Sequence, residues 1–170
     1  LSKLKTKLDD AETGLTREQK AFAMAEDLYM AAVRTNSPEI YRRAADAFGK
    51  LINDFPVEAR LGQGTCLARI RKFQEAIAVL HPAFEIDPAN PTILKVILQI
   101  YLATNELDEA QTVVESGLNL TNRDLILLSL AIRIYARRKD MERTRSLLSE
   151  FLATLPTLSD PEREKAVEEF

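Results

Sequence analysis

The sequence has one cysteine (Cys66), one histidine (His81), five glycines and no tryptophan among its 170 residues. A single cysteine excludes an intramolecular disulfide framework and a cysteine-rich zinc site, because both need several thiols. A reducing, cytoplasmic compartment is therefore the default expectation. Glycine is scarce while Leu, Ala, Glu and Arg dominate, and these residues favour helices, so the composition predicts an all-α fold.

Long hydrophobic runs are also missing. A membrane helix needs about 18 to 20 apolar residues, and the longest candidate here, 125–132, ends at Arg133. The start of the chain does not have the pattern of a signal peptide. Because the chain begins with Leu1 and not with Met, whether it is a fragment of a longer protein is left open, and an upstream leader or anchor stays an alternative.

Charge of one sign is not in excess. The formal net charge is −3 with 29% charged residues, which argues against binding nucleic acid over the whole surface, since such proteins are usually basic. The densest basic run lies near the end of the chain and is interrupted by Asp140 and Glu142. It comprises Arg133, Arg137, Arg138, Lys139, Arg143 and Arg145. Phosphate binding is one interpretation of this run, but a solvated helix hairpin is favoured, and no nucleic-acid partner is expected.

The sequence does contain a repeat with a period of 34 residues, whose three copies begin at residues 73, 107 and 141. The three copies are Phe73, Ala76, Leu80, Ala83 and Pro88; Leu107, Ala110, Val114, Gly117 and Asn122; and Met141, Thr144, Leu148, Phe151 and Pro156. A similar set begins at Tyr41, 32 residues before Phe73. A helical hairpin of this length cannot bury its apolar face alone, so neighbouring hairpins must stack.

Capping signals divide this repeat into helices. Thr16 and Gln19 have the spacing of a capping box, which predicts a helix from Thr16 to about Asn36. A second helix is predicted from Pro38 to about 54, and two more over 57–70 and 73–86. Asn90 is predicted to cap the next helix, with Pro91 at its first position.

We therefore expect an N-terminal extension or linker over 1–15, four hairpin repeats over 16–158 and a capping helix over 159–170. The repeats are predicted at 16–56, 57–90, 91–124 and 125–158. Leu1, Leu4 and Leu8 share one helical face, so self-association through this end is a further expectation. The last segment is mostly charged, as an exposed solenoid end requires.

The second repeat carries the clearest family pattern. Its residues in order are Gly64, Leu67, Phe73, Ala76, Leu80, Ala83 and Pro88. This order of small, large and aromatic residues resembles the tetratricopeptide repeat (TPR), and the resemblance covers roughly 25–158. The later repeats depart from this pattern. Leu98 and Ile132 occupy the position of the small residue Gly64, and Thr144 occupies a position where alanine is expected. The resemblance implies a right-handed α-solenoid of about four hairpins whose first helices line a concave groove.

In this family the groove commonly holds a peptide, which implies a set of partner-binding residues here. They are Tyr29, Leu61, Thr65, Arg69, Lys95, Gln99, Leu102, Ser129, Arg133 and Arg137. Leu61, Thr65 and Val96 stand where the family's carboxylate clamp needs polar groups, so that clamp is not expected. The cations favour an acidic, amphipathic partner, and the alternative is that they are solvated surface charges.

No catalytic, metal or cofactor site is expected. His81 precedes Pro82 on a second helix, without a partner at triad-like spacing. Cys66 aligns with two isoleucines and is expected to be buried. The run Gly62, Gln63, Gly64 lacks the strand and the Gly-Lys-Ser/Thr of a phosphate loop. Gly64 is expected to serve helix packing. Gly62 is less easily explained in a helix interior, and the alternatives are that it admits a neighbouring side chain or a ligand.

The leading functional prediction is a non-enzymatic TPR scaffold or adaptor that binds a peptide or partner protein. The alternative is a secretion-type chaperone for an exported or insoluble protein, because residues 61–66 and the small number of repeats resemble translocator chaperones. A regulator that binds RNA or DNA through the basic run is a third class, for which strongly salt-dependent binding is expected.

Overall fold

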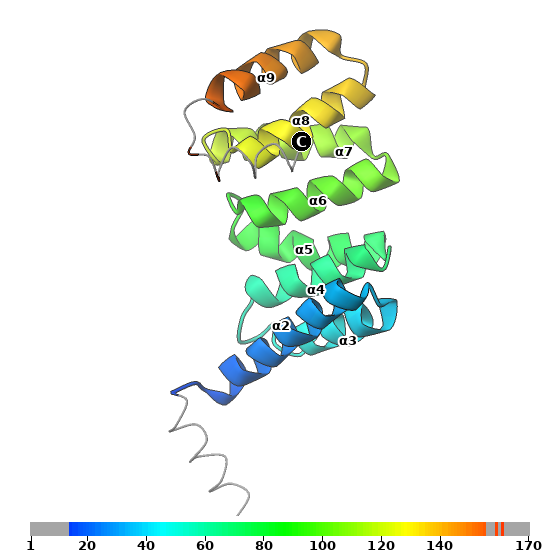
Figure 1. Ribbon diagram of the computed structural model, residues 1–170, viewed down its shortest axis with the longest axis vertical. Coiled ribbons are helices and arrows are strands. Elements are labelled where there is room, and N and C mark those ends of the chain that lie inside the picture. Colours follow the sequence, from blue (N-terminus) through cyan, green and yellow to red (C-terminus); the bar gives the residue numbers. More distant parts are fainter. Residues whose placement is uncertain (1–13, 156–158, 160, 162–170) are drawn as a thin grey trace, which may run out of the picture. The chain divides into compact units, whose positions relative to one another are not determined.

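The computed structural model describes residues 14–155, 159 and 161, and these form eight α-helices that follow one another as hairpins (Figure 1). The helices are α2 (Arg17–Thr35), α3 (Pro38–Gly49), α4 (Glu58–Arg69), α5 (Phe73–Ile86), α6 (Pro91–Thr104), α7 (Leu107–Leu120), α8 (Leu125–Arg137) and α9 (Met141–Thr154). The prediction of an all-α chain of consecutive helical hairpins is confirmed. The predicted apolar face of Leu1, Leu4 and Leu8 lies outside the described residues, as does the capping helix apart from Ser159 and Pro161.

Local capping chemistry sets the helix starts. At Thr16 both halves of the capping box form: the hydroxyl accepts from Gln19 N at 3.2 Å, and Thr16 N donates to Gln19 Oε1 at 2.9 Å. Asn90 caps α6 by accepting from Thr92 N and Ile93 N, with Pro91 at the first position. These side chains satisfy amides that have no partner within the helix, so the starts of α2 and α6 lie where the sequence predicts.

One predicted boundary is wrong. The second helix was expected to reach about residue 54, but α3 ends at Gly49 and turns follow. There Leu51 N donates to Phe48 O and Asp54 N to Leu51 O, at 2.9 and 3.1 Å. These bonds span three residues and tighten the chain into turns, since a glycine at the helix end gives little support to a further helical turn.

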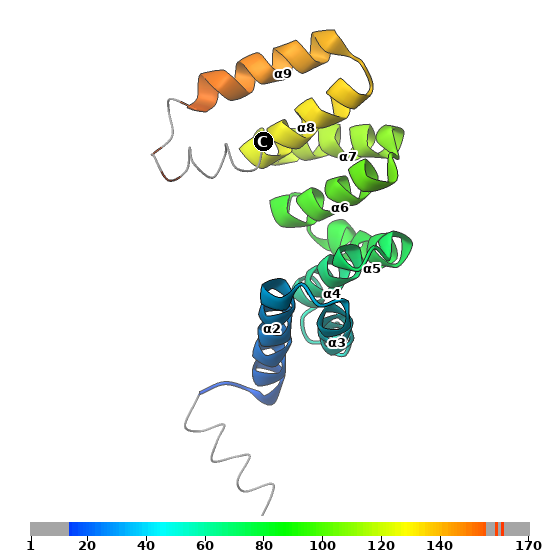
Figure 2. The ribbon, with the colours of Figure 1, turned by 45° about the vertical axis from the view of Figure 1, so that its right-hand side comes forward.

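The chain falls into two compact units, divided between Ala83 and Phe84. In unit 1 (14–83 of the described residues), α2 packs against α3, and α3 against α4 (Figure 2). The ring of Phe22 lies edge-on to Phe48, with centroids 5.5 Å apart. A Cβ on Gly62 would lie 2.8 Å from three carbon atoms of the Phe48 ring. Gly62 therefore admits the Phe48 ring, which is the first of the two alternatives that the sequence left open.

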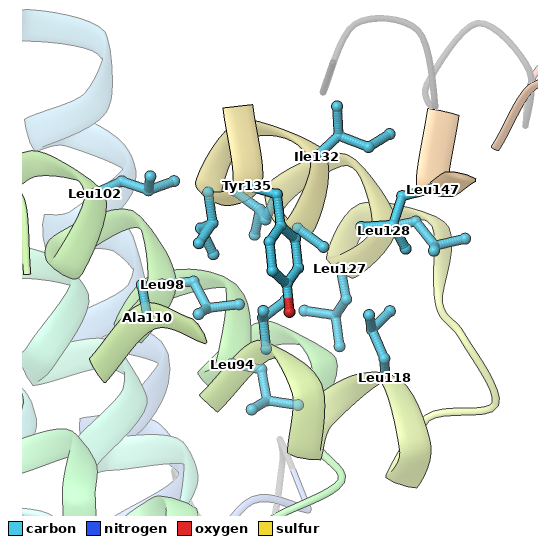
Figure 3. Close-up of a cluster of buried hydrophobic side chains, with 14 of the residues drawn as sticks. Leu94, Leu98, Leu102, Ala110, Leu118, Leu127, Leu128, Ile132, Tyr135 and Leu147 are labelled. Atoms are coloured by element: carbon cyan, nitrogen blue, oxygen red, sulfur yellow. The ribbon is translucent and has the colours of Figure 1, made fainter. Parts of the chain in front are cut away.

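Unit 2 (84–155 of the described residues, with 159 and 161) has a continuous apolar core between α6, α7, α8 and α9 (Figure 3). Leu94 and Leu98 from α6, Leu118 from α7, and Leu127 and Leu128 from α8 all belong to this core. All five are buried. This core is built from the residues that carry the 34-residue repeat together with those between them, as stacked hairpins require.

Cys66 is fully buried on α4, as the alignment with two isoleucines predicted. Burial raises the pKa of its thiol from 9.0 to about 12, because a thiolate would lose its hydration. The thiol is therefore a core group and not a nucleophile near neutral pH. The stabilisation that this burial contributes is complete below pH 9 and declines as the pH rises toward 12.

We expect native Cys66 to react with a disulfide reagent such as DTNB at least about a thousandfold more slowly than Cys66 of the unfolded chain, because reaction requires local opening of α4. The measurement is the rate of thionitrobenzoate release at about pH 8, with and without guanidinium chloride. Rapid modification of one thiol per chain without denaturant would contradict the burial of Cys66.

Candidate functional site

In unit 2 the first helices of the two hairpins, α6 and α8, lie side by side. Neither helix contains Asp or Glu, so their only charged groups are Lys95, Arg133 and Arg137. The acidic residues of these hairpins lie on the second helices and in the loops instead. Arg133 and Gln99 are exposed, Lys95 is half-buried, and Arg137 is exposed at the end of α8. We refer to these four residues as the first-helix face of unit 2.

Arg133 is the most available cation of this face. It forms no hydrogen bond or ion pair with any residue that the structure describes. Arg137 is different, because its guanidinium donates to the carbonyl oxygen of Leu102 at the end of α6. This bond satisfies a helix-terminal carbonyl that has no partner within α6. Arg137 therefore joins two consecutive first helices and has only its remaining N–H groups for a partner.

Two predicted groove residues lie in the interior of unit 2. Leu102 is 3% exposed and belongs to the apolar core. Ser129 is 1% exposed, and its hydroxyl donates to Ile126 O at 2.8 Å. Neither side chain presents surface to a partner, because both are buried in the packing of unit 2. Helical phase alone placed them with Gln99 and Arg133, but phase does not show how closely the neighbouring helix approaches.

The predicted groove residues of unit 1 are more closely tied to the fold. Tyr29 on α2 is half-buried, and its ring lies 6.2 Å from that of Tyr41 on α3. The Thr65 hydroxyl donates to Leu61 O at 2.7 Å, and both residues are half-buried on α4. Arg69 is exposed in the last turn of α4. Of this set, only Arg69 is mostly accessible.

Half of the cations in the basic run near the end of unit 2 are bonded to acceptors in the preceding hairpin, and two of them form ion pairs. Arg138 forms an ion pair with Asp108, and Arg143 pairs with Glu115 at 3.1 Å. With the bond from Arg137 to Leu102 O, three of the six cations have acceptors in the preceding hairpin. This pattern agrees with a structural role for the run rather than a phosphate site.

A polar network around Glu115, which the repeat pattern does not predict, joins α7, α8 and α9. Glu115 accepts hydrogen bonds from the Tyr135 hydroxyl, from Gln111 at 3.0 Å and from Arg143 at 3.1 Å. The Arg143 guanidinium also lies 5.3 Å from the centroid of the Tyr135 ring. The hydrogen bond from Tyr135 is the main cause that lowers the pKa of Glu115. Burial is the main cause that raises the pKa of Tyr135 to about 12.

The same network lines a pocket of about 250 Å³ that is completed by Leu118, Asn119, Arg123 and Leu147. Arg123 forms a two-point ion pair with Glu150. Each charged group at this pocket thus has a partner within the chain, so the pocket offers no unmet charge to a ligand.

We expect the Tyr135→Phe substitution to lower the free energy of unfolding by about 1 kcal/mol near neutral pH, because Glu115 loses a hydrogen-bond donor. The contribution of the lowered Glu115 pKa is present above the ordinary value of 4.5 and fades as the pH falls below it. The variant should therefore lose less stability than the wild type on acidification. Urea unfolding at two pH values measures both effects.

Glu142→Gln is the matched control for this prediction, because Glu142 is an exposed acid on α9 outside the network. This substitution should change the free energy of unfolding near neutral pH by less than about 0.5 kcal/mol. The loss of that free energy on acidification should also differ from the wild-type loss by less than about 0.5 kcal/mol. Equal pH profiles for Tyr135→Phe and the wild type would contradict the role given to the network.

The structure adds little support for catalysis or metal binding. His81 is exposed on the second helix α5. Across the described residues, no three His, Cys, Asp or Glu side chains are grouped so that they could hold a metal ion. None of the helices in this part of the chain is both long and apolar enough to cross a membrane.

Comparisons with known proteins agree with the repeat. A family model described as tetratricopeptide repeat matches residues 71–131. The solved structure "MamA 41-end from Desulfovibrio magneticus RS-1" is similar with a TM-score of 0.65 and 17% identity, over 80% of this chain and 78% of that chain. The solved structure "MamA RS-1 ArsTM double mutant" has a TM-score of 0.64 and 16% identity, over 91% of this chain and 84% of that chain. No curated protein matches the sequence. At these identities the likeness to MamA shows a shared fold.

Proposed function

Because this chain is a tetratricopeptide repeat protein, we propose that it is a non-enzymatic interaction module that binds a peptide segment of a partner protein. Such repeats typically mediate protein–protein interaction, and their stacked helices present a continuous surface. The observation that carries the proposal is the charge of the first-helix face of unit 2. Two adjacent helices expose cations and an amide, contain no acid, and leave Arg133 without an acceptor among the described residues.

A partner segment with acidic residues matches this face. A carboxylate can accept two hydrogen bonds from the Arg133 guanidinium, and Gln99 can bond to the backbone of an extended peptide. An exposed ion pair contributes only about 0.2 to 1 kcal/mol, so charge alone does not give tight binding. We therefore assign affinity to apolar partner side chains, and register and selectivity to the cations. Leu61, Thr65 and Arg69 are the corresponding positions on α4 in unit 1.

The test is capture of a partner by the full chain, followed by a measurement of its affinity for charge-reversed variants. Lys95→Glu with Arg133→Glu should weaken binding at least about tenfold, because two favourable interactions become repulsive. The matched control reverses two cations outside the face, Lys139→Glu with Arg145→Glu, and should change the affinity less than about threefold.

If both double variants lose the same affinity, the partner is attracted by the net charge of the chain and not by the first-helix face. No loss in either would reject the first-helix face as the binding surface. The chaperone alternative predicts a different result: the captured protein should be insoluble alone and soluble in a one-to-one complex on coexpression. Capture of nucleic acid that disappears steeply with salt would favour the third class.

A further inference from the structure

A hollow of about 400 Å³ lies in unit 1 between the second helices α3 and α5, with α4 at its base. Its volume is within the range of about 300 to 1,000 Å³ that is common for ligand sites. It is formed by different helices from those of the face proposed above, so it is a separate surface. Ala45 and Asp46 line it from α3, Gln63 from α4, and Ala78 and Val79 from α5.

Gln63 has an unmet hydrogen-bonding group at the base of this hollow. Its amide oxygen Oε1 is buried and accepts no hydrogen bond from any residue of the described part. A buried acceptor without a donor costs about 1 to 3 kcal/mol, so native proteins rarely retain one without a reason. The amide fits here because Gly49 lacks a side chain: a Cβ on Gly49 would lie 2.7 Å from Gln63 Nε2. The terminal amide torsion of glutamine is soft, so rotation about it can exchange the positions of the amide oxygen and nitrogen and present the oxygen to the hollow.

The charges around the hollow leave one carboxylate unmatched. Lys72 pairs with Glu75 at 3.0 Å, and Arg42 pairs with Glu39. Asp46 is exposed and forms no ion pair or hydrogen bond with other described residues. The hollow therefore combines an unmet amide oxygen, an unmatched carboxylate and an aliphatic wall.

We propose that this hollow is a second docking site, which receives an arginine side chain of a protein partner. The planar guanidinium has five N–H donors and can donate to Gln63 Oε1 and to the Asp46 carboxylate at once. Its methylene groups pack against Ala45, Ala78 and Val79, as long basic side chains commonly do on apolar surface. An ammonium group is more strongly hydrated and less suited to two acceptors in one plane, so lysine binds more weakly.

The experiment titrates the full, isotope-labelled chain with N-acetyl-arginine N-methylamide and follows amide NMR signals. Saturable shifts are expected at the Gln63 side-chain amide and at the backbone amides of Asp46 and Val79, with a Kd of about 1 to 10 mM. Asp46→Asn should raise the Kd by about two- to fivefold. Asp27→Asn, which removes an exposed carboxylate on α2 in the same unit, should leave it unchanged.

Gln63→Met gives a second, independent readout. It removes the buried acceptor while keeping the length of the side chain, so it should abolish the shifts at Asp46 and Val79 and raise the melting temperature of the free protein. A lower melting temperature with unchanged binding would assign Gln63 a packing role and overturn the proposal.

Other results also overturn it: no saturation with the arginine probe, an unchanged Kd in Asp46→Asn, or tighter binding of N-acetyl-glutamate N-methylamide through Arg42 and Lys72. Because the probe is a single amino-acid derivative, the result does not depend on the partner or on the first-helix face. Failure here and failure of the proposed function are therefore distinguishable.

Discussion

The Gly64→Ala substitution should lower the free energy of unfolding by about 1 to 2 kcal/mol, although alanine is the better helix former. A Cβ on Gly64 would lie 2.5 Å from Leu80 Cγ and 2.7 Å from Leu80 Cδ2. Leu80 is fully buried, so it has no space into which it can move. Overpacking costs about 1 to 3 kcal/mol, and the gain in helix propensity of about 1 kcal/mol offsets part of it. Urea or thermal unfolding measures the difference.

Gly117→Ala is the matched control. It is also a buried helical glycine, but a Cβ there would lie 3.1 Å from Leu94 Cδ1, a distance that a slight adjustment relieves. Its effect should be within about 0.5 kcal/mol of zero, because packing and propensity oppose each other.

A double variant tests the cause of the Gly64 effect. Leu80→Ala removes the side chain that collides with the new methyl group, so Gly64→Ala should cost at least about 1 kcal/mol less in that background. If Gly64→Ala lowers the free energy of unfolding equally with Leu80 and with Ala at position 80, contact with Leu80 is not the reason that position 64 needs a glycine.

The Leu127→Ala substitution in unit 2 should cost about 3 kcal/mol of stability. Leu127 is fully buried in the core formed with Leu94, Leu98 and Leu118 (Figure 3). Truncation removes buried apolar area and leaves a cavity that rigid helices fill only in part, which costs about 2 to 5 kcal/mol in comparable cores. Denaturant unfolding of the variant gives the value.

Leu120→Ala makes the same chemical change at the end of α7 in the same unit. Leu120 is 50% exposed, so its truncation should cost less than about 1 kcal/mol. Similar costs at Leu120 and Leu127 would contradict the apolar core described for unit 2.

Much of the fold could be predicted because its signals are local. Thr16 with Gln19, Asn90 with Pro91, and Pro88 after α5 define helix ends through bonds or clashes within a few residues. Burial of Cys66 followed from the repeat. The end of α3 was missed because the balance between another helical turn and a tight turn after Gly49 depends on packing, and the periodicity continues past the true end.

The candidate site was less predictable than the fold. Helical phase grouped Leu102 and Ser129 with Gln99 and Arg133, but packing within unit 2 buries the first two and leaves the others exposed. The functional interest of Gln63 was missed, since an unmet buried oxygen is a property of its surroundings.

A 34-residue apolar repeat and its capping residues are enough to specify a series of helical hairpins, because they act within or between adjacent helices. Which polar groups have partners depends instead on how the helices pack. Arg137 reaches Leu102 O across 35 residues of sequence, and Tyr135 reaches Glu115 across 20. Arg133 is left exposed and without such a partner in the described part. Such pairings depend on distances and directions between helices, which no spacing along the chain encodes.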